Sequence, residues 1–269
     1  MIRDITIGQY YATDSVIHRL DPRVKVVGTL AYLISLFCFN KFSGYIIAAL
    51  FFAILVKISH VPFKFMVKGL KPIMFMLIFT AALNLFWTPG EVVLVKVWVF
   101  TITLEGVKRS VFMALRLTFL IIGSSLMTLT TTPNQLTDAL EKLLKPLNKI
   151  KVPVHEIAMM MSIALRFIPI LVDETDKIMK AQMARGADFE SGNVIQRIKA
   201  MLPILIPLFI SAARRANDLA LAMDARCYHG GEGRTKMKPL KYKKQDVIAY
   251  LTVAAYAVVL GVVVKFSVF

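Results

Sequence analysis

Runs of apolar residues long enough to cross, or nearly cross, a lipid bilayer constrain the fold of this chain more than any other feature. A transmembrane helix needs about 20 predominantly apolar residues. Such runs lie at residues 24–39, 45–56, 72–87, 111–129 and 247–264. The first two are short for a span, so we expect helix tilt or local thinning of the bilayer there. The sequence therefore predicts an all-α membrane protein with about five transmembrane helices.

The apolar runs divide the chain into segments of different character, namely residues 1–23, 24–129, 130–244 and 245–269. The first is polar, the second holds four predicted spans, and the last holds the fifth. The third carries frequent charges, yet its apolar residues recur at helical spacing, which predicts a cytoplasmic-side domain of long helices.

Two local patterns refine the second segment. Alternating β-branched residues follow the turn Thr88-Pro89-Gly90, so residues 88–105 are predicted to form a short extracellular hairpin or an interfacial segment. Gly123-Ser124-Ser125 gives the fourth span a small-residue face, which favours close helix packing. Arg116 lies within the same span and is either an arginine that snorkels to the interface or a buried polar contact.

Positive charge dominates the chain, with 33 Lys+Arg against 17 Asp+Glu and a formal net charge of +16. This charge could serve nucleic acid, but in a chain that is 57% hydrophobic it favours basic loops on the cytoplasmic side of a membrane. Basic residues gather before the first span, between the second and third spans, and within residues 130–244. We therefore expect a multi-pass cell-membrane protein with a cytoplasmic N-terminus, an external C-terminus and no nucleic-acid partner.

The motifs of hydrolytic enzymes are incomplete. His155-Glu156 begins a zinc-hydrolase motif, but Met159 stands where the second histidine is needed. The glycine-rich segment 230–235 lacks the lysine of a nucleotide-binding loop. Two cysteines provide neither a disulfide framework nor a metal site. The sequence thus predicts a chain with no catalytic residue, metal site or bound cofactor of its own.

The most informative signal is duplicated. One long helix is predicted to end at Ala184-Arg185-Gly186, and the next at Ala225-Arg226-Cys227. A cation in the last turn complements the helix dipole, which is one interpretation of each arginine. The other is docking, because a small neighbour leaves a narrow helix tip and a guanidinium forms forked bonds to carboxylates.

Several methionines lie on these helices, at positions 159, 160, 161, 179, 183 and 223. Methionine is flexible and polarizable, so these side chains either repack against more than one partner or simply fill the core.

The chain resembles the T components of energy-coupling factor (ECF) transporters, the CbiQ-like family, over nearly its whole length. The resemblance rests on His18-Arg19-Leu20-Asp21-Pro22-Arg23-Val24-Lys25, Leu165-Arg166-Phe167-Ile168-Pro169 with Glu174, Ala184-Arg185-Gly186, Arg214-Arg215-Ala216 with Asp218-Leu219-Ala220, and Met223-Asp224-Ala225-Arg226-Cys227-Tyr228. Cys227 departs from the family pattern, which has glycine at this position.

The resemblance implies a coupling subunit between two ABC-type ATPases and a membrane-embedded, substrate-binding S component for vitamin or metal-ion uptake. It implies that residues 130–244 hold coupling helices, and that ATP and magnesium are bound by the ATPases. Docking is expected at Ala184, Arg185, Gly186, Ala225 and Arg226, with secondary contacts at Arg214 and Arg215. Contacts with the S component are expected at Met159, Met160, Met161, Met179 and Met183.

A stand-alone secondary carrier or channel is the alternative. It would need polar or ionisable residues, or broken helices, around a site at membrane depth. Asn84 and Arg116 are its only support in the sequence. A membrane enzyme is a third possibility, but it lacks a catalytic constellation.

The predicted topology can be tested by cysteine labelling in intact cells, in a background without Cys38 and Cys227. An impermeant maleimide should label Ser267→Cys and leave Lys236→Cys unlabelled, because the basic segment 130–244 is predicted to lie inside. Equal labelling of the two positions from outside would contradict the predicted orientation.

Overall fold

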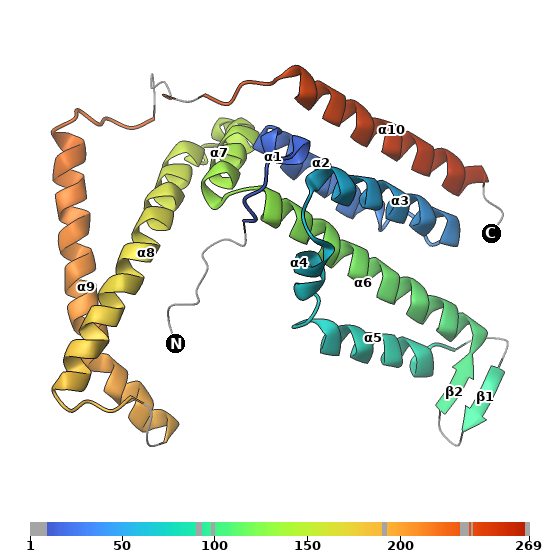
Figure 1. Ribbon diagram of the computed structural model, residues 1–269, viewed down its shortest axis with the longest axis horizontal. Helices are drawn as coiled ribbons and strands as arrows, with labels where there is room; N and C mark the ends of the chain where they lie inside the picture. Colours follow the sequence, from blue (N-terminus) through green and yellow to red (C-terminus); the bar gives the residue numbers. More distant parts are fainter. Residues whose placement is uncertain are drawn as a thin grey trace. The chain divides into compact units, whose positions relative to one another are not determined.

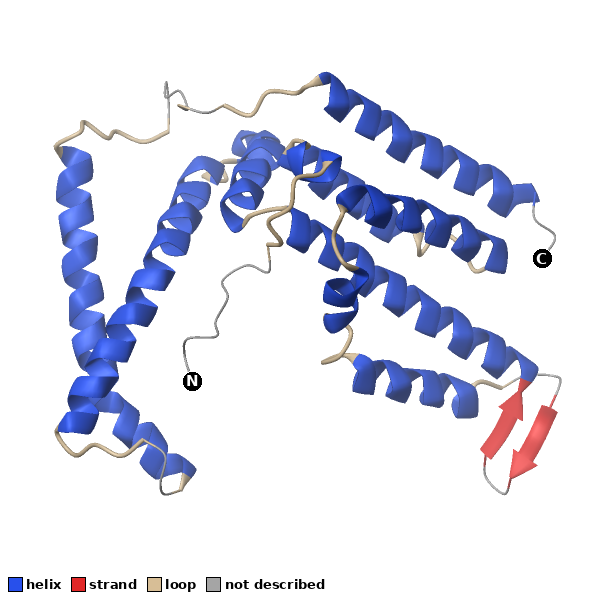
Figure 2. Cartoon of the chain, in the orientation of Figure 1, coloured by secondary structure: helices blue, strands red, loops and turns tan. Residues whose placement is uncertain are grey.

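The computed structural model describes residues 10–89, 93–97, 100–189, 193–231, 237 and 239–266. Helices dominate these residues, with one pair of short strands (Figures 1 and 2). The elements in chain order are α1 Val16–Arg19, α2 Pro22–Ser35, α3 Phe42–Ser59, α4 Phe63–Lys68, α5 Met74–Trp87, β1 Val93–Val97, β2 Phe100–Thr103, α6 Leu104–Thr130, α7 Pro133–Leu144, the 3-10 helix Lys145–Ile150, α8 Val154–Ala184, α9 Val194–Asp224 and α10 Lys244–Phe266. The predicted all-α membrane fold is confirmed.

The chain divides into two compact units. The core unit lies within residues 8–139 and 240–269, and the two-helix unit lies within residues 140–239. The boundaries of the predicted domain 130–244, and its placement on the cytoplasmic side, stay predictions.

Four helices are long and apolar enough to cross a bilayer, among the residues that the structure describes: α3, α6, α8 and α10. α5 is apolar but shorter, and α2 has 14 residues. α6 begins at Leu104, earlier than the apolar run at 111–129, because the Thr103 hydroxyl accepts a hydrogen bond from the Gly106 amide at 3.0 Å and caps the helix. Length and composition also qualify α8, which the sequence analysis assigns to the cytoplasmic-side domain.

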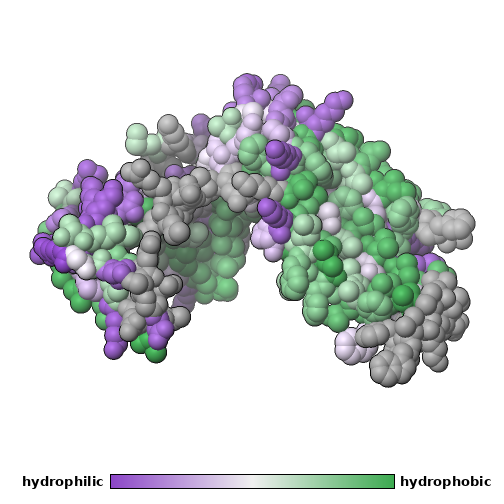
Figure 3. All heavy atoms as spheres, turned by 60° about the horizontal axis from the view of Figure 1, so that its bottom comes forward, coloured by the Kyte–Doolittle hydropathy of each residue, from purple (hydrophilic) through white to green (hydrophobic). Residues whose placement is uncertain are grey.

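The core unit packs around an aromatic cluster contributed by α2, α3, α6 and α10. The rings of Phe51 and Tyr256 stack with centroids 4.3 Å apart, and Tyr32 lies 5.9 Å from Phe52. The Tyr256 hydroxyl shares a hydrogen bond of 2.9 Å with Ser35. Apolar side chains also cover most of the visible surface of this unit (Figure 3), as expected of helices that face lipid.

The predicted hairpin is present. β1 and β2 pair antiparallel with Val95 opposite Ile102 and Val97 opposite Phe100. The pairing is irregular between Val93 and Val95. Gly90 and the rest of its turn at 90–92 lie outside the described residues, and the extracellular placement stays a prediction.

Arg116 makes a polar contact. Its Nη2 donates to the Phe39 carbonyl oxygen at 3.1 Å and to Asn40 Oδ1 at 2.6 Å, which fastens α6 to the loop between α2 and α3. The structure thus shows a polar contact for this arginine, at a half-buried position rather than a buried one.

The small-residue face of α6 is confirmed. A Cβ atom at Gly123 would lie 2.7 Å from Cε1 of Tyr32, so only glycine lets α2 and α6 approach this closely. Ser125 lies against the end of α4, where its Oγ would be 3.0 Å from a Cβ at Gly69.

We expect Gly123→Val to destabilise the core unit by about 1–3 kcal/mol, because the buried Tyr32 ring cannot give way. Gly261→Val in α10 is the matched control, since nothing lies within 4 Å of a Cβ there. Thermal unfolding of the purified chain in detergent should show a lower Tm for Gly123→Val alone. A Tm equal to that of the control would mean that this packing does not limit stability.

Candidate functional site

α8 ends in a Schellman motif around the first predicted docking arginine. Gly186 adopts φ +89°, and its amide donates to the Met183 carbonyl at 2.9 Å. The Ala187 amide donates to the Gln182 carbonyl at 3.0 Å. These two bonds satisfy carbonyls that a helix end otherwise leaves free, and they place Arg185 at the C-cap.

α9 ends in the same motif, although the sequence suggested a looser stop. Cys227 adopts φ +54° and donates its amide to Asp224 at 2.9 Å, while the Tyr228 amide donates to Met223 at 3.1 Å. The missing glycine thus does not remove the cap, because the cysteine itself takes the left-handed conformation. That conformation is strained by roughly 1–2 kcal/mol in a residue with a Cβ.

Both arginines are accessible at their helix ends. Arg185 and Arg226 are exposed, as are the preceding Ala184 and Ala225. Within the described ranges neither guanidinium forms an ion pair or a hydrogen bond to a helix carbonyl. The caps are made by backbone amides, so the two guanidinium groups remain available to a partner.

The other two candidate arginines, Arg214 and Arg215, differ in their contacts. Glu174 of α8 accepts hydrogen bonds from Ser211 Oγ at 2.5 Å and from Arg215 Nη2 at 2.9 Å. Arg215 therefore joins α8 to α9, whereas Arg214 is exposed. Pro203 and Pro207 lie inside α9, and Figure 1 shows this helix changing direction along its length.

The candidate methionines are unequally buried. Met160, Met161 and Met183 are 58%, 42% and 48% exposed, so core filling does not explain them. Met159 and Met179 are half-buried. A role of these five side chains in binding a partner stays a prediction.

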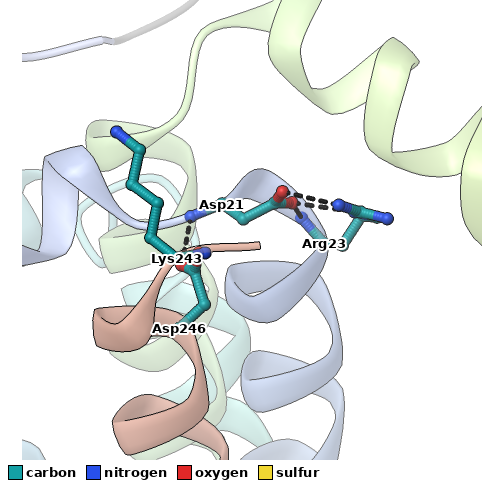
Figure 4. Close-up of polar contacts among 4 residues, drawn as sticks. All are labelled: Asp21, Arg23, Lys243 and Asp246. Carbon is teal, nitrogen blue, oxygen red and sulfur yellow. Dashed lines mark hydrogen bonds and ion pairs between the residues drawn. The ribbon is translucent and has the colours of Figure 1, made fainter. Parts of the chain in front are cut away.

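The motif at residues 18–25 takes part in a polar cluster of the core unit (Figure 4). We call this cluster, formed by Asp21, Arg23 and Asp246, the polar clasp. The Asp21 carboxylate accepts from the Arg23 amide and from Nε and Nη2 of its guanidinium, at 2.8–3.0 Å. Burial raises the pKa of Asp21, but the bonds to Arg23 outweigh it and leave this pKa below its ordinary value. The Arg23 guanidinium also lies 3.8 Å from the centre of the Tyr242 ring.

Asp246 completes the clasp, and sequence analysis missed it. The residue is only 1% exposed, and its carboxylate accepts from the Asp21 amide at 2.8 Å and from the Lys243 amide at 2.7 Å (Figure 4). The bond to Lys243 is half of a capping box, with an acid in the first turn of α10 reaching back to the preceding amide. This local signal was readable in the sequence, but the bond to Asp21 was not.

Both ring nitrogens of His18 have hydrogen-bond partners within the N-terminal segment. Its Nδ1 lies 2.6 Å from Ser15 Oγ and its Nε2 lies 3.1 Å from the Tyr11 carbonyl oxygen. Burial lowers the pKa of His18.

His155, which begins the incomplete zinc-hydrolase motif, lies with its Nδ1 3.1 Å from Glu141 Oε1. In the described part of the chain, no group of three or more His, Cys, Asp or Glu residues could hold a metal.

A family model and several curated relatives match this chain over most of its length. The sequence model of the CbiQ family, described as "Cobalt transport protein", matches residues 13–237. The chain is 59% identical over 252 residues to the energy-coupling factor transporter transmembrane protein EcfT of Clostridium kluyveri, covering 93% of each. It is 57% identical to the protein of the same name from Ruminiclostridium cellulolyticum, covering 92% of each. The Bacillus subtilis protein of that name is 45% identical over 97% of this chain and 98% of the relative.

The strained cap of α9 predicts opposite effects of two exchanges. Cys227→Gly should stabilise the end of α9 by about 1 kcal/mol, because glycine adopts positive φ freely. Gly186→Cys should destabilise the end of α8 by a similar amount, since no atom lies within 4 Å of a Cβ there and strain alone acts. Hydrogen exchange of the amides at 186–187 and 227–228 measures both. Faster exchange in Cys227→Gly would contradict the strain argument.

Proposed function

The chain belongs to the CbiQ family as the transmembrane protein of an energy-coupling factor transporter, and from this premise we propose that it couples two cytosolic ABC-type ATPases to a substrate-binding S component. The chain itself is a non-catalytic subunit of the transporter. ATP and magnesium are bound by the ATPases, and a vitamin or metal ion is bound by the S component.

The two Schellman ends carry the docking part of this proposal. Each places an exposed arginine at the tip of a 31-residue helix, next to an alanine. A tip of this kind fits a groove with acidic residues, where a guanidinium binds a carboxylate through two parallel bonds. Two equivalent tips suit one ATPase each.

The contacts between α8 and α9 support transmission of motion. Glu174 binds both Ser211 and Arg215, so the two helices are fastened by charge-assisted bonds as well as by packing. A displacement of either tip would therefore be passed to the other helix. The exposed Met160, Met161 and Met183 supply an adaptable surface for the S component, with Met159 and Met179 beside them.

The two residues that suggested a stand-alone carrier are used in other ways. Asn84 Nδ2 donates to the Thr80 carbonyl of its own helix at 2.8 Å. Arg116 binds the loop after α2. Neither interaction builds a site for a transported ion.

We expect Arg185→Ala combined with Arg226→Ala to insert normally but to lose ATPase retention and uptake. A helix cap alone is worth about 1 kcal/mol or less, whereas truncating one partner of a buried, hydrogen-bonded pair costs about 2–5 kcal/mol. Co-purification of the ATPases and substrate uptake in vesicles measure the difference. The double variant should be more impaired than either single variant.

Two controls separate docking from capping. Lys180→Ala removes an exposed cation from the same end of α8 and should retain both ATPases. Arg185→Lys with Arg226→Lys keeps the charges but not the planar fork, so docking predicts partial loss and capping predicts none. Normal ATPase retention and uptake in the double alanine variant would show that docking uses another surface.

A further inference from the structure

The core unit contains a partly open cavity of about 110 Å³ that the proposed coupling role does not use. α2, α3, α6 and α10 form its walls, and most of the lining is apolar, with Phe51, Leu55, Leu126 and Val253 among the side chains. A dry apolar cavity of about 150 Å³ can hold a benzene molecule. This cavity can therefore hold several carbons of an aliphatic chain.

The cavity exists partly because residue 28 has no side chain. Gly28 lies on its wall, and a Cβ there would meet only Val253 Cγ2, at the ordinary contact distance of 3.4 Å. Close helix packing thus does not demand glycine at this position, in contrast to Gly123. A larger side chain at position 28 would enter the cavity.

The polar part of the lining includes a buried cation. Lys25 is 7% exposed, and its Nζ donates to the carbonyl oxygens of His18 at 3.1 Å and Thr130 at 2.8 Å. An ammonium group has three donors, so one has no partner among the residues that the structure describes. Within the described residues no carboxylate lies in ion-pair distance of it; Asp21 and Asp246 act on it only at longer range. A buried charge in this position favours an anionic ligand.

The membrane supplies a ligand with both properties. Three of the cavity walls belong to helices that can cross a bilayer. Lys25 lies on the side predicted to be cytoplasmic, where anionic headgroups attract cations. We propose that this cavity is a binding site for an anionic phospholipid, with the upper part of one acyl chain between α2 and α10 and the headgroup region at Lys25.

The test uses the full chain in nanodiscs of phosphatidylcholine with a small fraction of phosphatidylglycerol that carries a photoactivatable diazirine near its acyl carbonyl. After illumination, peptide mapping should find the label on cavity residues such as Met127 and Thr252. Unlabelled phosphatidylglycerol should compete and phosphatidylcholine should not. Gly28→Leu should lower this labelling about tenfold. The leucine side chain would displace roughly two methylenes of the acyl chain from the cavity, and losing their burial weakens binding by about that factor.

Gly261→Leu is the matched control, because it adds the same side chain to a helix position with no neighbour within 4 Å. It should leave the labelling unchanged. Lys25→Met should retain the label but lose the preference for phosphatidylglycerol. If that variant does not fold, the competition in the wild-type chain still decides the headgroup.

Four results would overturn the proposal. Equal labelling of the wild-type chain and Gly28→Leu would exclude the cavity. Label spread evenly over the lipid-facing helices would exclude a defined site. Competition by phosphatidylcholine would exclude a preference for anionic phospholipid. Competition by a free fatty acid, without competition by phosphatidylglycerol, would exclude a phospholipid.

Discussion

Buried and half-buried charged side chains of the core unit bind the ends of neighbouring helices. Lys25 donates to the last residue of α6, Thr130, and Arg116 donates to Phe39, just beyond α2. Asp246 accepts amides that precede α2 and α10. Helix C-termini leave carbonyls with partial negative charge free, and these bind cations. Helix N-termini leave amides with partial positive charge free, and these bind carboxylates. A chain in lipid must satisfy these groups internally, and here charged side chains do so.

This arrangement explains how segments far apart in the chain are held together. Asp21 and Asp246 are 225 positions apart, yet one hydrogen bond fixes the start of α10 against the start of α2. Aromatic packing of Tyr256 on Phe51 adds a second contact, between α10 and α3. The apolar interface alone would allow α10 to slide, since lipid and leucine offer similar surroundings. The polar clasp defines its register.

In the two-helix unit the helix ends are capped in a different way. Its two helix ends are capped by their own backbone, through the left-handed residues Gly186 and Cys227. Because the cap needs no side chain, Arg185 and Arg226 are released from local structure. Arg215, by contrast, is engaged by Glu174. Chemically identical side chains on the same helices therefore differ in availability, and the difference comes from their neighbours.

The sequence by itself determined the class of protein, most of the helices, the hairpin and the duplicated Ala-Arg motif, because apolar length, periodicity and turn residues act locally. It also indicated Gly123 as a packing site. It did not reveal the bond from Asp246 to Asp21, the engagement of Arg116 and Arg215, or the left-handed conformation of Cys227. The cavity beside Lys25 was equally invisible. These features depend on which backbone groups and rings the fold brings next to a side chain, and only tertiary structure decides that.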